Sequence, residues 1–406
     1  MKRRTIWKPG PAIEVNTEAL VEAIGRVAKF VGRKAPIHFK VYEEYLHIYA
    51  WDGASKGVTA YCAVFKGFGR MSFCLDQDVA KTHFSIRPFG TTILRLDTAW
   101  VDDRETSGHR IHAAQSSDEG TTEFDISVKD SADPEHFFHD IPSRLSVRAN
   151  ELRSALSMAC AIANSADNGA VQIYGAKRDG LSVCATNKKD FFQAQIQGGG
   201  NIGYREGQDF SPKSIAALVQ ALDSLKDSAV LVHFNAFQLQ ICTEVADYTI
   251  VPLRQSSPFP TLKLIAGAKE DSTSIGLNRP SFLSMVRASA CASEAEGGAL
   301  RPISLSIESD EIGVLISGMN LNCPSYVRSS VPIRVTPGNP SPSWISLSPA
   351  ILLPVLSEIG SPDVTIIYSP GSGLLELTYS GQGESVILLA SVPNPYHEQL
   401  LGPAHA

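Results

Sequence analysis

The segment that decides the fold is Leu145-Ser146-Val147-Arg148-Ala149-Asn150-Glu151-Leu152, followed by Leu156 and Ala159. Its alternating apolar residues predict a short strand, and the apolar residues at i, i+4 and i+7 from Leu152 predict a helix directly after it. Two other segments share this pattern, which makes it an internal repeat. The three segments begin at residues 13, 145 and 275, so the starts lie 132 and 130 residues apart. The outer two are residues 13–20, with Ile24 and Val27, and residues 275–282, with Val286 and Ser289.

Each repeat also contains a second helix-forming segment. Ser211-Pro212-Lys213 and Ser348-Pro349 place a serine at the N-cap and a proline at the first helical position. The apolar stripes that follow are Ile215, Leu218, Leu222 and Leu225 in the middle repeat and Leu352, Val355, Leu356 and Ile359 in the last, with a weaker counterpart over residues 76–84. Alternating runs over 229–234 and 237–241, and over 364–368 and 374–379, then predict two hairpins.

These patterns predict an α+β protein of three repeated domains, each with two helices packed on an antiparallel sheet. The alternative is that three unrelated domains have openings that match by chance. The predicted division is a basic N-terminal extension over residues 1–12, repeated domains over 13–143, 144–272 and 273–396, and a C-terminal tail over 397–406.

Composition narrows the functional class. The 406 residues hold 36 Lys and Arg against 42 Asp and Glu, a net charge of −6, which excludes a uniformly basic nucleic-acid coat but allows a local basic surface. No apolar run is long enough to span a membrane, and the seven cysteines form no C-x-x-C motif. We therefore expect a cytoplasmic protein with reduced cysteines.

The middle repeat carries the most specific motifs. They are Gly180-Leu181-Ser182-Val183-Cys184-Ala185-Thr186-Asn187, the Ser-Pro-Lys helix start with two hairpin strands after it, and Phe259-Pro260. In this order they resemble the bacterial replicative sliding clamp, the DNA polymerase III beta subunit family. The resemblance implies three DNA-clamp domains per chain and a head-to-tail homodimeric ring. It also implies a processivity factor that encircles double-stranded DNA without reading its sequence, with no enzymatic activity and no cofactor.

The resemblance further implies that helices line the hole and contact phosphates. At 100° per residue, Arg26, Lys29 and Arg33 fall opposite the apolar stripe of their helix. The alternative is a solvated helix whose late basic residues complement its own macrodipole. Acidic residues crowd the last repeat, so we expect DNA contacts weighted toward the first. The full predicted DNA-binding set is Arg26, Lys29, Arg33, Lys34, Arg148, Arg153, Lys213, Arg279 and Arg287.

An apolar groove between the middle and last domains is the implied docking site for short peptides of the polymerase and the clamp loader. Its implied residues are Thr186, Phe191, Pro260, Leu264, Val392, Pro393 and Asn394. The alternative for each is ordinary packing between domains. Two features depart from the family pattern: Lys188-Lys189-Asp190 stands where Gly-His-Arg is usual, and a tail follows Tyr396. We expect this tail either to be flexible or to lie near the groove and bias which partners enter.

Other signals are weaker. The pairs His109/His112 and His136/His139 suggest a metal site, but residues at i and i+3 of a strand face opposite sides, so we expect none. The basic residues before residue 9 predict either a disordered segment or a phosphate-seeking arm, and residues 102–120 predict a polar loop. A second functional hypothesis is a specialised clamp-like interaction or regulatory module, from a mobile element or repair pathway, that does not serve bulk replication.

Overall fold

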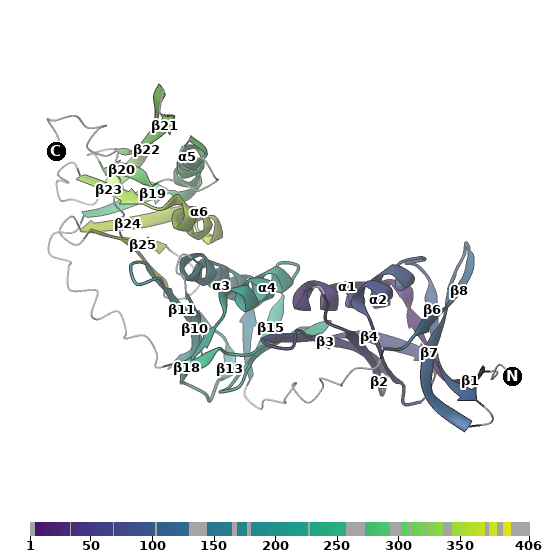
Figure 1. Cartoon of the computed structure of the whole chain (residues 1–406). Coiled ribbons are helices and arrows are strands. Elements are labelled where there is room, and N and C mark those ends of the chain that lie inside the picture. Colours follow the sequence, from purple (N-terminus) through teal and green to yellow (C-terminus); the bar gives the residue numbers. More distant parts are fainter. Residues whose placement is uncertain are drawn as a thin grey trace. The chain divides into compact units, whose positions relative to one another are not determined.

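The computed structural model divides the chain into two compact units, residues 1–146 with 229–252 and residues 147–228 with 253–406. Each unit is α+β, with helices on one side of an antiparallel sheet (Figure 1). The structure describes residues 5–32, 34–67, 69–101, 104–129, 144–164, 169–176, 180–225, 228–256, 273–292, 302–307, 311–320, 323–335, 343–369, 373–379 and 385–390.

Six helices occur within these ranges, and all three predicted strand-to-helix openings are present. Each opening passes from a strand into a helix without a loop: β1 (Thr5–Asn16) leads into α1, β9 (Arg144–Arg148) into α3 and β19 (Thr273–Asn278) into α5. The helices are α1 (Thr17–Val31), α2 (Gln77–Phe84), α3 (Ala149–Ala163), α4 (Pro212–Leu222), α5 (Arg279–Ala292) and α6 (Pro349–Glu358). None of them combines the length and apolar character that crossing a lipid bilayer requires.

The first unit has one branched antiparallel sheet. Its strands follow the order β15-β16-β17-β4-β1-β6-β7-β8, and β3, β2 and β5 extend from the other edge of β4. The strands are β1 (Thr5–Asn16), β2 (Ile37–Tyr42), β3 (Tyr45–Trp51), β4 (Lys56–Lys66), β5 (Ser72–Leu75), β6 (Thr91–Val101), β7 (Arg104–Ser117), β8 (Gly120–Ser127), β15 (Ala229–Phe234), β16 (Leu239–Cys242) and β17 (Ala246–Ile250). The strand β9 (Arg144–Arg148) spans the residue at which the two units divide.

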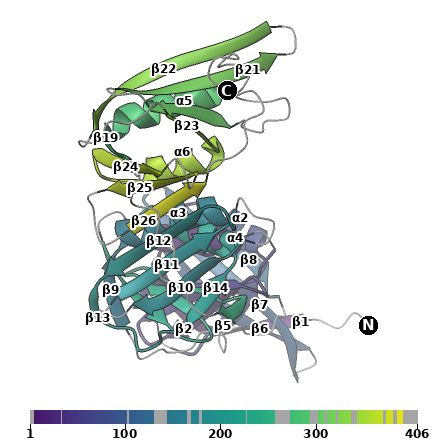
Figure 2. The ribbon, with the colours of Figure 1, turned by 90° about the vertical axis from the view of Figure 1, so that its left-hand side faces the viewer.

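The second unit is built on a longer sheet with the order β18-β14-β10-β11-β12-β26-β25-β24-β19-β22-β21-β20-β23. Strand β26 pairs with β12 from Phe191 opposite Leu388 to Ala194 opposite Ser385, so strands far apart in the sequence lie side by side (Figure 2). The strands of this sheet are β10 (Val171–Ala176), β11 (Gly180–Thr186), β12 (Phe191–Gln197), β14 (Gly207–Phe210), β18 (Arg254–Ser256), β19 (Thr273–Asn278), β20 (Ile303–Ile307), β21 (Glu311–Asn320), β22 (Cys323–Val335), β23 (Ser343–Leu347), β24 (Asp363–Ser369), β25 (Leu374–Tyr379) and β26 (Ser385–Ala390). The short strand β13 (Gly199–Asn201) is not part of this order.

The predicted apolar stripes form the core. The first helix buries its stripe fully, and Asn16 caps it by accepting a hydrogen bond from the Ala19 amide at 2.9 Å. In α4 the stripe is buried through Leu222, where the helix ends. The buried stripe residues are Leu20, Ile24, Val27, Ile215, Leu218, Leu222, Leu352, Val355, Leu356 and Ile359. The two predicted hairpins are also confirmed, as β15–β16 and β24–β25.

The buried cysteines behave as small apolar residues. Burial raises the pKa of the Cys62 thiol to about 11 and those of Cys160 and Cys184 to about 12. All three, and the buried Cys74, are free thiols. Because the thiolate is the reactive form, these cysteines are poor nucleophiles near neutral pH.

The predicted polar loop over residues 102–120 is wrong, because residues 104–117 form strand β7. This strand pairs with β6 on one side and β8 on the other. It buries Ile111 and Ala113 but carries Arg110 and His112 on the other face, where both contact Asp125. The polar residues of this segment lie on one face of the sheet, where they form charge pairs with neighbouring strands. Their number made the segment resemble a loop and hid the alternating apolar residues that form the other face.

The N-terminal segment is also structured from Thr5 onward. Strand β1 pairs with β6 from Thr5 opposite Val101 to Asn16 opposite Thr91, with an irregularity between Pro9 and Ala12. The Lys8 ammonium lies 3.4 Å from the centroid of the Trp100 ring, a cation–π contact. Residues 5–12 are therefore the first eight residues of the twelve-residue strand β1 and not a disordered segment.

The core assignment can be tested with two leucines of the first unit. Leu20→Ala should lower the free energy of unfolding by about 2–5 kcal/mol, because it leaves a cavity under α1. Leu231→Ala should cost about 1 kcal/mol or less, because Leu231 is 38% exposed. Urea unfolding followed by circular dichroism measures both, and equal losses would contradict the assignment.

Candidate nucleic-acid interface and partner pocket

The polar face of α1 presents two of the predicted DNA-binding residues to solvent. Lys29 lies exposed in the last turn, and Lys34 follows the helix with a left-handed φ of 89°. Arg26 is half-buried and forms an ion pair with Glu22 one turn earlier in the same helix. Arg33 lies outside the described residues.

The helices of the middle repeat add two more exposed cations. Lys213 lies in the first turn of α4, whose N-cap Ser211 accepts a hydrogen bond from the Ser214 amide at 3.0 Å. Arg148 precedes α3, and its side chain is 66% exposed and 3.8 Å from the Glu151 carboxylate. A pair at this distance and exposure contributes little to stability, so Arg148 can still reach another anion.

Arg153 has a different environment, because it points from α3 onto α6. Its guanidinium lies 2.8 Å from the Glu358 carboxylate and 3.6 Å from that of Asp223. The same Glu358 accepts a hydrogen bond from the Ser157 hydroxyl at 3.0 Å on its carboxylate and one from the Ser154 hydroxyl at 2.9 Å on its carbonyl. These contacts join α3 to α6 and neutralise much of the charge of Arg153.

Arg279 likewise has structural partners. It donates hydrogen bonds to the carbonyl of Ser361 at 2.8 Å and to that of Leu356 at 3.2 Å. The carbonyls at the end of a helix carry partial negative charge, so this cation stabilises the C-terminal end of α6. Arg287 is exposed and lies within 3.4 Å of the Ser357 hydroxyl.

The nine predicted DNA-binding residues thus fall into three groups. Arg26, Arg153 and Arg279 have protein partners for their charges, and Arg33 is outside the described residues. The exposed ones are Lys29, Lys34, Arg148, Lys213 and Arg287. DNA contact by each residue of the set remains a prediction.

A cavity of about 210 Å³ lies next to the turn that departs from the family pattern. Its floor is formed by the buried apolar side chains Leu347 at the end of β23, Ile351 at the start of α6 and Leu389 at the end of β26. Its rim is polar and includes the Lys189 side chain. The lining residues are Asn187, Lys189, Asp190, Leu347, Ser348, Ile351, Leu389 and Ala390.

Asp190 ties the turn to β26. Although 94% buried, its carboxylate accepts hydrogen bonds from the Ala390 amide at 2.9 Å and from the Asn187 side-chain amide at 2.6 Å. Asn187 in turn accepts from the backbone amides of Lys189 and Asp190. A buried carboxylate is stable when its charge is hydrogen-bonded in this way. Asp190 is therefore a structural residue of the cavity wall, while Lys188 and Lys189 are exposed.

The predicted pocket residues are only partly described. Thr186 donates a hydrogen bond to the Asp190 carbonyl at 2.9 Å, and Phe191 begins β12, so both flank the turn at the cavity. Pro260, Leu264, Val392, Pro393 and Asn394 lie outside the described residues. The sequence prediction missed Leu347, Ile351 and Leu389, although the Ser348-Pro349 helix start marked their neighbourhood. These residues lie near the 187–190 turn only because β26 of the last repeat pairs with β12 of the middle repeat, which the sequence does not reveal.

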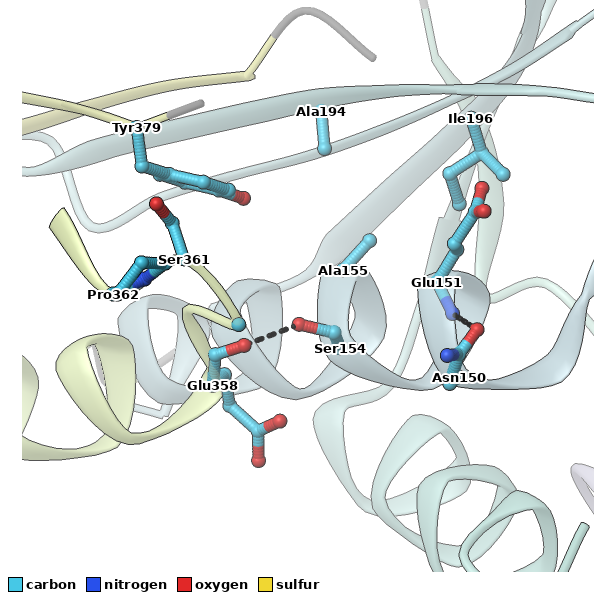
Figure 3. A pocket seen from close by; sticks show the side chains of 11 residues that line it. Asn150, Glu151, Ser154, Ala155, Ala194, Ile196, Glu358, Ser361, Pro362 and Tyr379 are labelled. Atoms are coloured by element: carbon cyan, nitrogen blue, oxygen red, sulfur yellow. Dashed lines mark hydrogen bonds between the residues drawn. The ribbon is translucent and has the colours of Figure 1, made fainter. Parts of the chain in front are cut away.

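A second cavity, of about 420 Å³, lies between α3 and the sheet (Figure 3). Ala155 lines it from the helix and Ala194 from β12, while Tyr379 reaches in from β25. Glu151 points up from α3 toward Ile196, and burial raises the pKa of its carboxyl, an effect that nearby Arg148 opposes. The Glu358 carboxylate points away from this cavity, toward the side where Arg153 binds it.

A metal site is not evident in the described part of the chain. No group of three or more His, Cys, Asp or Glu side chains there could hold a metal ion. His112 instead contacts the Asp125 carboxylate at 2.9 Å, and His136 and His139 lie outside the described residues.

Solved structures with the same fold are numerous. A putative DNA polymerase III beta subunit from Eubacterium rectale ATCC 33656 is 12% identical with a TM-score of 0.74, covering 94% of this chain and 99% of that one. The beta subunit from Pseudomonas aeruginosa is 13% identical with a TM-score of 0.74, covering 94% and 100%. The one from Thermotoga maritima is 15% identical with a TM-score of 0.70, covering 95% and 100%.

The chain therefore has the fold of bacterial sliding clamps over nearly its whole length, which confirms the resemblance found in the sequence. No protein-family model matches the chain, and no curated protein matches it. Identities of 12–15% carry the fold but not the residues of a site.

The α3–α6 contact gives a testable consequence. Glu358→Gln should lower the free energy of unfolding by about 1–2 kcal/mol, because Arg153 loses a charged partner in a partly buried position. Glu376→Gln on β25 is the matched control, and we expect it to change stability by about 0.5 kcal/mol or less. Thermal unfolding of both variants measures the difference. If Glu358→Gln leaves the free energy of unfolding unchanged, the ion pair contributes nothing to joining the helices.

Proposed function

We propose that this chain is a DNA sliding clamp, a non-enzymatic processivity factor that encircles duplex DNA and tethers a polymerase. The observation that carries the proposal is the fold, which matches DNA polymerase III beta subunits over 94–95% of the chain with TM-scores of 0.70–0.75. A tether of this kind needs no base contacts, because phosphate contacts hold DNA without sequence preference. Retention then comes from enclosure, and affinity can be modest.

The exposed cations support a weak, non-specific DNA surface in a chain of net charge −6. Lys29 and Lys34 on or after α1, and Arg148 and Lys213 on the helices of the middle repeat, offer charges at helix ends. Arg153 and Arg279 hold helices together instead, so we propose fewer phosphate contacts from the second unit than its basic residues alone suggest.

The proposed ring is a homodimer whose subunits meet head to tail. The strand path of the first unit ends on β8 and that of the second on β23. Edge strands expose backbone groups that can pair with another chain, and head-to-tail pairing of two different edges can close a ring. The three domains, over residues 13–143, 144–272 and 273–396, are part of this proposal.

The partner site of the proposed clamp is the cavity beside Lys189. Its apolar floor and polar rim suit a short peptide with one or two apolar anchors. We propose that the polymerase and the clamp loader dock such peptides there. The wall that the resemblance assigned to Val392, Pro393 and Asn394 would follow directly after Ala390.

A specialised clamp that does not serve bulk replication is the second candidate. The Asn187–Asp190 turn favours it, since a buried aspartate and two exposed lysines replace the usual Gly-His-Arg at the pocket. The two candidates can be distinguished by measuring whether the chain stimulates processive synthesis by the host's replicative polymerase. Stimulation supports the first candidate, and binding without stimulation supports the second.

The oligomeric state is the most direct test of the ring. Light scattering after size-exclusion chromatography should give a mass near twice 43.7 kDa. If the edge strands pair as proposed, the dimer should dissociate into monomers only when the protein is strongly diluted. A monomer at every concentration would contradict the ring.

DNA contact can be measured by salt dependence. Lys29→Glu and Lys213→Glu should each weaken binding to a short duplex and lower the slope of log affinity against log salt by about one. Lys66→Glu is the control, because Lys66 is exposed on β4 and outside the predicted DNA-binding set. Fluorescence anisotropy over a salt series gives the slopes, and unchanged slopes for both helix variants would refute these contacts.

Enclosure has its own signature. With its loader, the clamp should remain on nicked circular DNA through gel filtration and be lost once the circle is linearised. Equal loss from both forms would contradict topological retention.

A further inference from the structure

The cavity beside Lys189 is adjacent to the point where the described chain ends. Ala390, the last residue of β26, lines it, and its amide is held by the Asp190 carboxylate at 2.9 Å. Residues 391–406 follow Ala390 directly. All of them are therefore tethered to the wall of the cavity, at most 16 residues from Ala390.

The chemistry of the cavity favours an apolar anchor with an acidic neighbour. Leu347, Ile351 and Leu389 make the floor, and all three are buried. Lys189 is the cation at the rim, while the one lining carboxylate, Asp190, is already hydrogen-bonded. An acidic side chain beside the anchor would therefore meet an ammonium and not a free carboxylate.

The tail carries this combination. Its sequence Glu398-Gln399-Leu400-Leu401 places two leucines shortly after a carboxylate. Leucine side chains are stabilised when they leave water for an apolar cavity. The carboxylate precedes them by two and three residues, which is within reach of a rim lysine.

The tether makes even weak docking effective. About ten residues separate Ala390 from Leu400, and a short linker gives its end an effective concentration in the millimolar range. The closure entropy of so short a loop is small. An intrinsic affinity of about 100 µM would therefore keep the cavity occupied most of the time.

We propose that Glu398–Leu401 docks into the cavity beside Lys189 and competes with partner peptides, so the chain limits access to its own pocket. The leucines occupy the apolar floor, and Glu398 pairs with Lys189. The identity of the competing partners rests on the proposed function, but the docking itself does not.

The test uses the full chain and a fluorescent synthetic peptide of residues 396–406. The Leu400→Ala/Leu401→Ala variant should bind this peptide about tenfold more tightly than the unmodified chain, because its own tail no longer fills the cavity. His405→Ala, a tail change outside the docking segment, should bind it like the unmodified chain. Equal affinities for the double variant and the unmodified chain, or no binding to either, would overturn the proposal.

A charge exchange locates the site. In the Leu400→Ala/Leu401→Ala background, Lys189→Glu should weaken peptide binding about two- to fivefold, and a Glu398→Lys peptide should recover it. Lys66→Glu in the same background should leave affinity unchanged. Lys189 is exposed, so its variant should fold, and a thermal melt verifies this. Loss without recovery by the exchanged peptide would place the peptide elsewhere and overturn the proposal.

The two proposals fail separately. Mass and retention on circular DNA report on the ring whether or not the tail docks. Peptide affinity reports on the tail whether or not the chain encircles DNA.

Discussion

Burial of one apolar helix face against an antiparallel sheet is the constraint on which the rest of the structure depends. It recurs wherever a strand passes straight into a helix, at Thr17, Ala149 and Arg279. With the apolar face fixed inward, the opposite face of each helix must carry the polar residues. The positions of Lys29 and Lys213 at the surface follow from Leu20 and Ile215 being inside.

A second level of organisation comes from contacts between repeats within the second unit. Backbone pairing of β12 with β26 continues one sheet across both repeats. On the helix side, Glu358 of α6 accepts hydrogen bonds from Arg153, Ser154 and Ser157 of α3. The cavity beside Lys189 lies next to this joint, and Asp190 lines it while bonding to β26, so a contact that joins the repeats also shapes the cavity.

The cations of the helical segments are of two kinds: some are bound by other groups of the protein, and others are exposed and could bind an external anion. Arg153 and Arg279 lie in helical segments as Lys29 does, yet their guanidiniums are engaged by a carboxylate and by helix-end carbonyls. An arginine with planar donors is suited to such fixed contacts, whereas an exposed lysine remains a mobile point charge. The proposed sliding on DNA would need the second kind, because such a protein must exchange one phosphate for the next.

Periodicity in the sequence determined the helices, the hairpins and the threefold repeat, because the spacing of apolar residues depends only on local geometry. It misjudged β7, whose polar face is matched by Asp97 and Asp125 on neighbouring strands. It could not assign the partners of Arg153 or Asp190, since Glu358 and Ala390 lie 205 and 200 residues away along the chain. Only the tertiary structure decides such pairs, because a charge is neutralised by whatever the fold brings within a few ångströms of it.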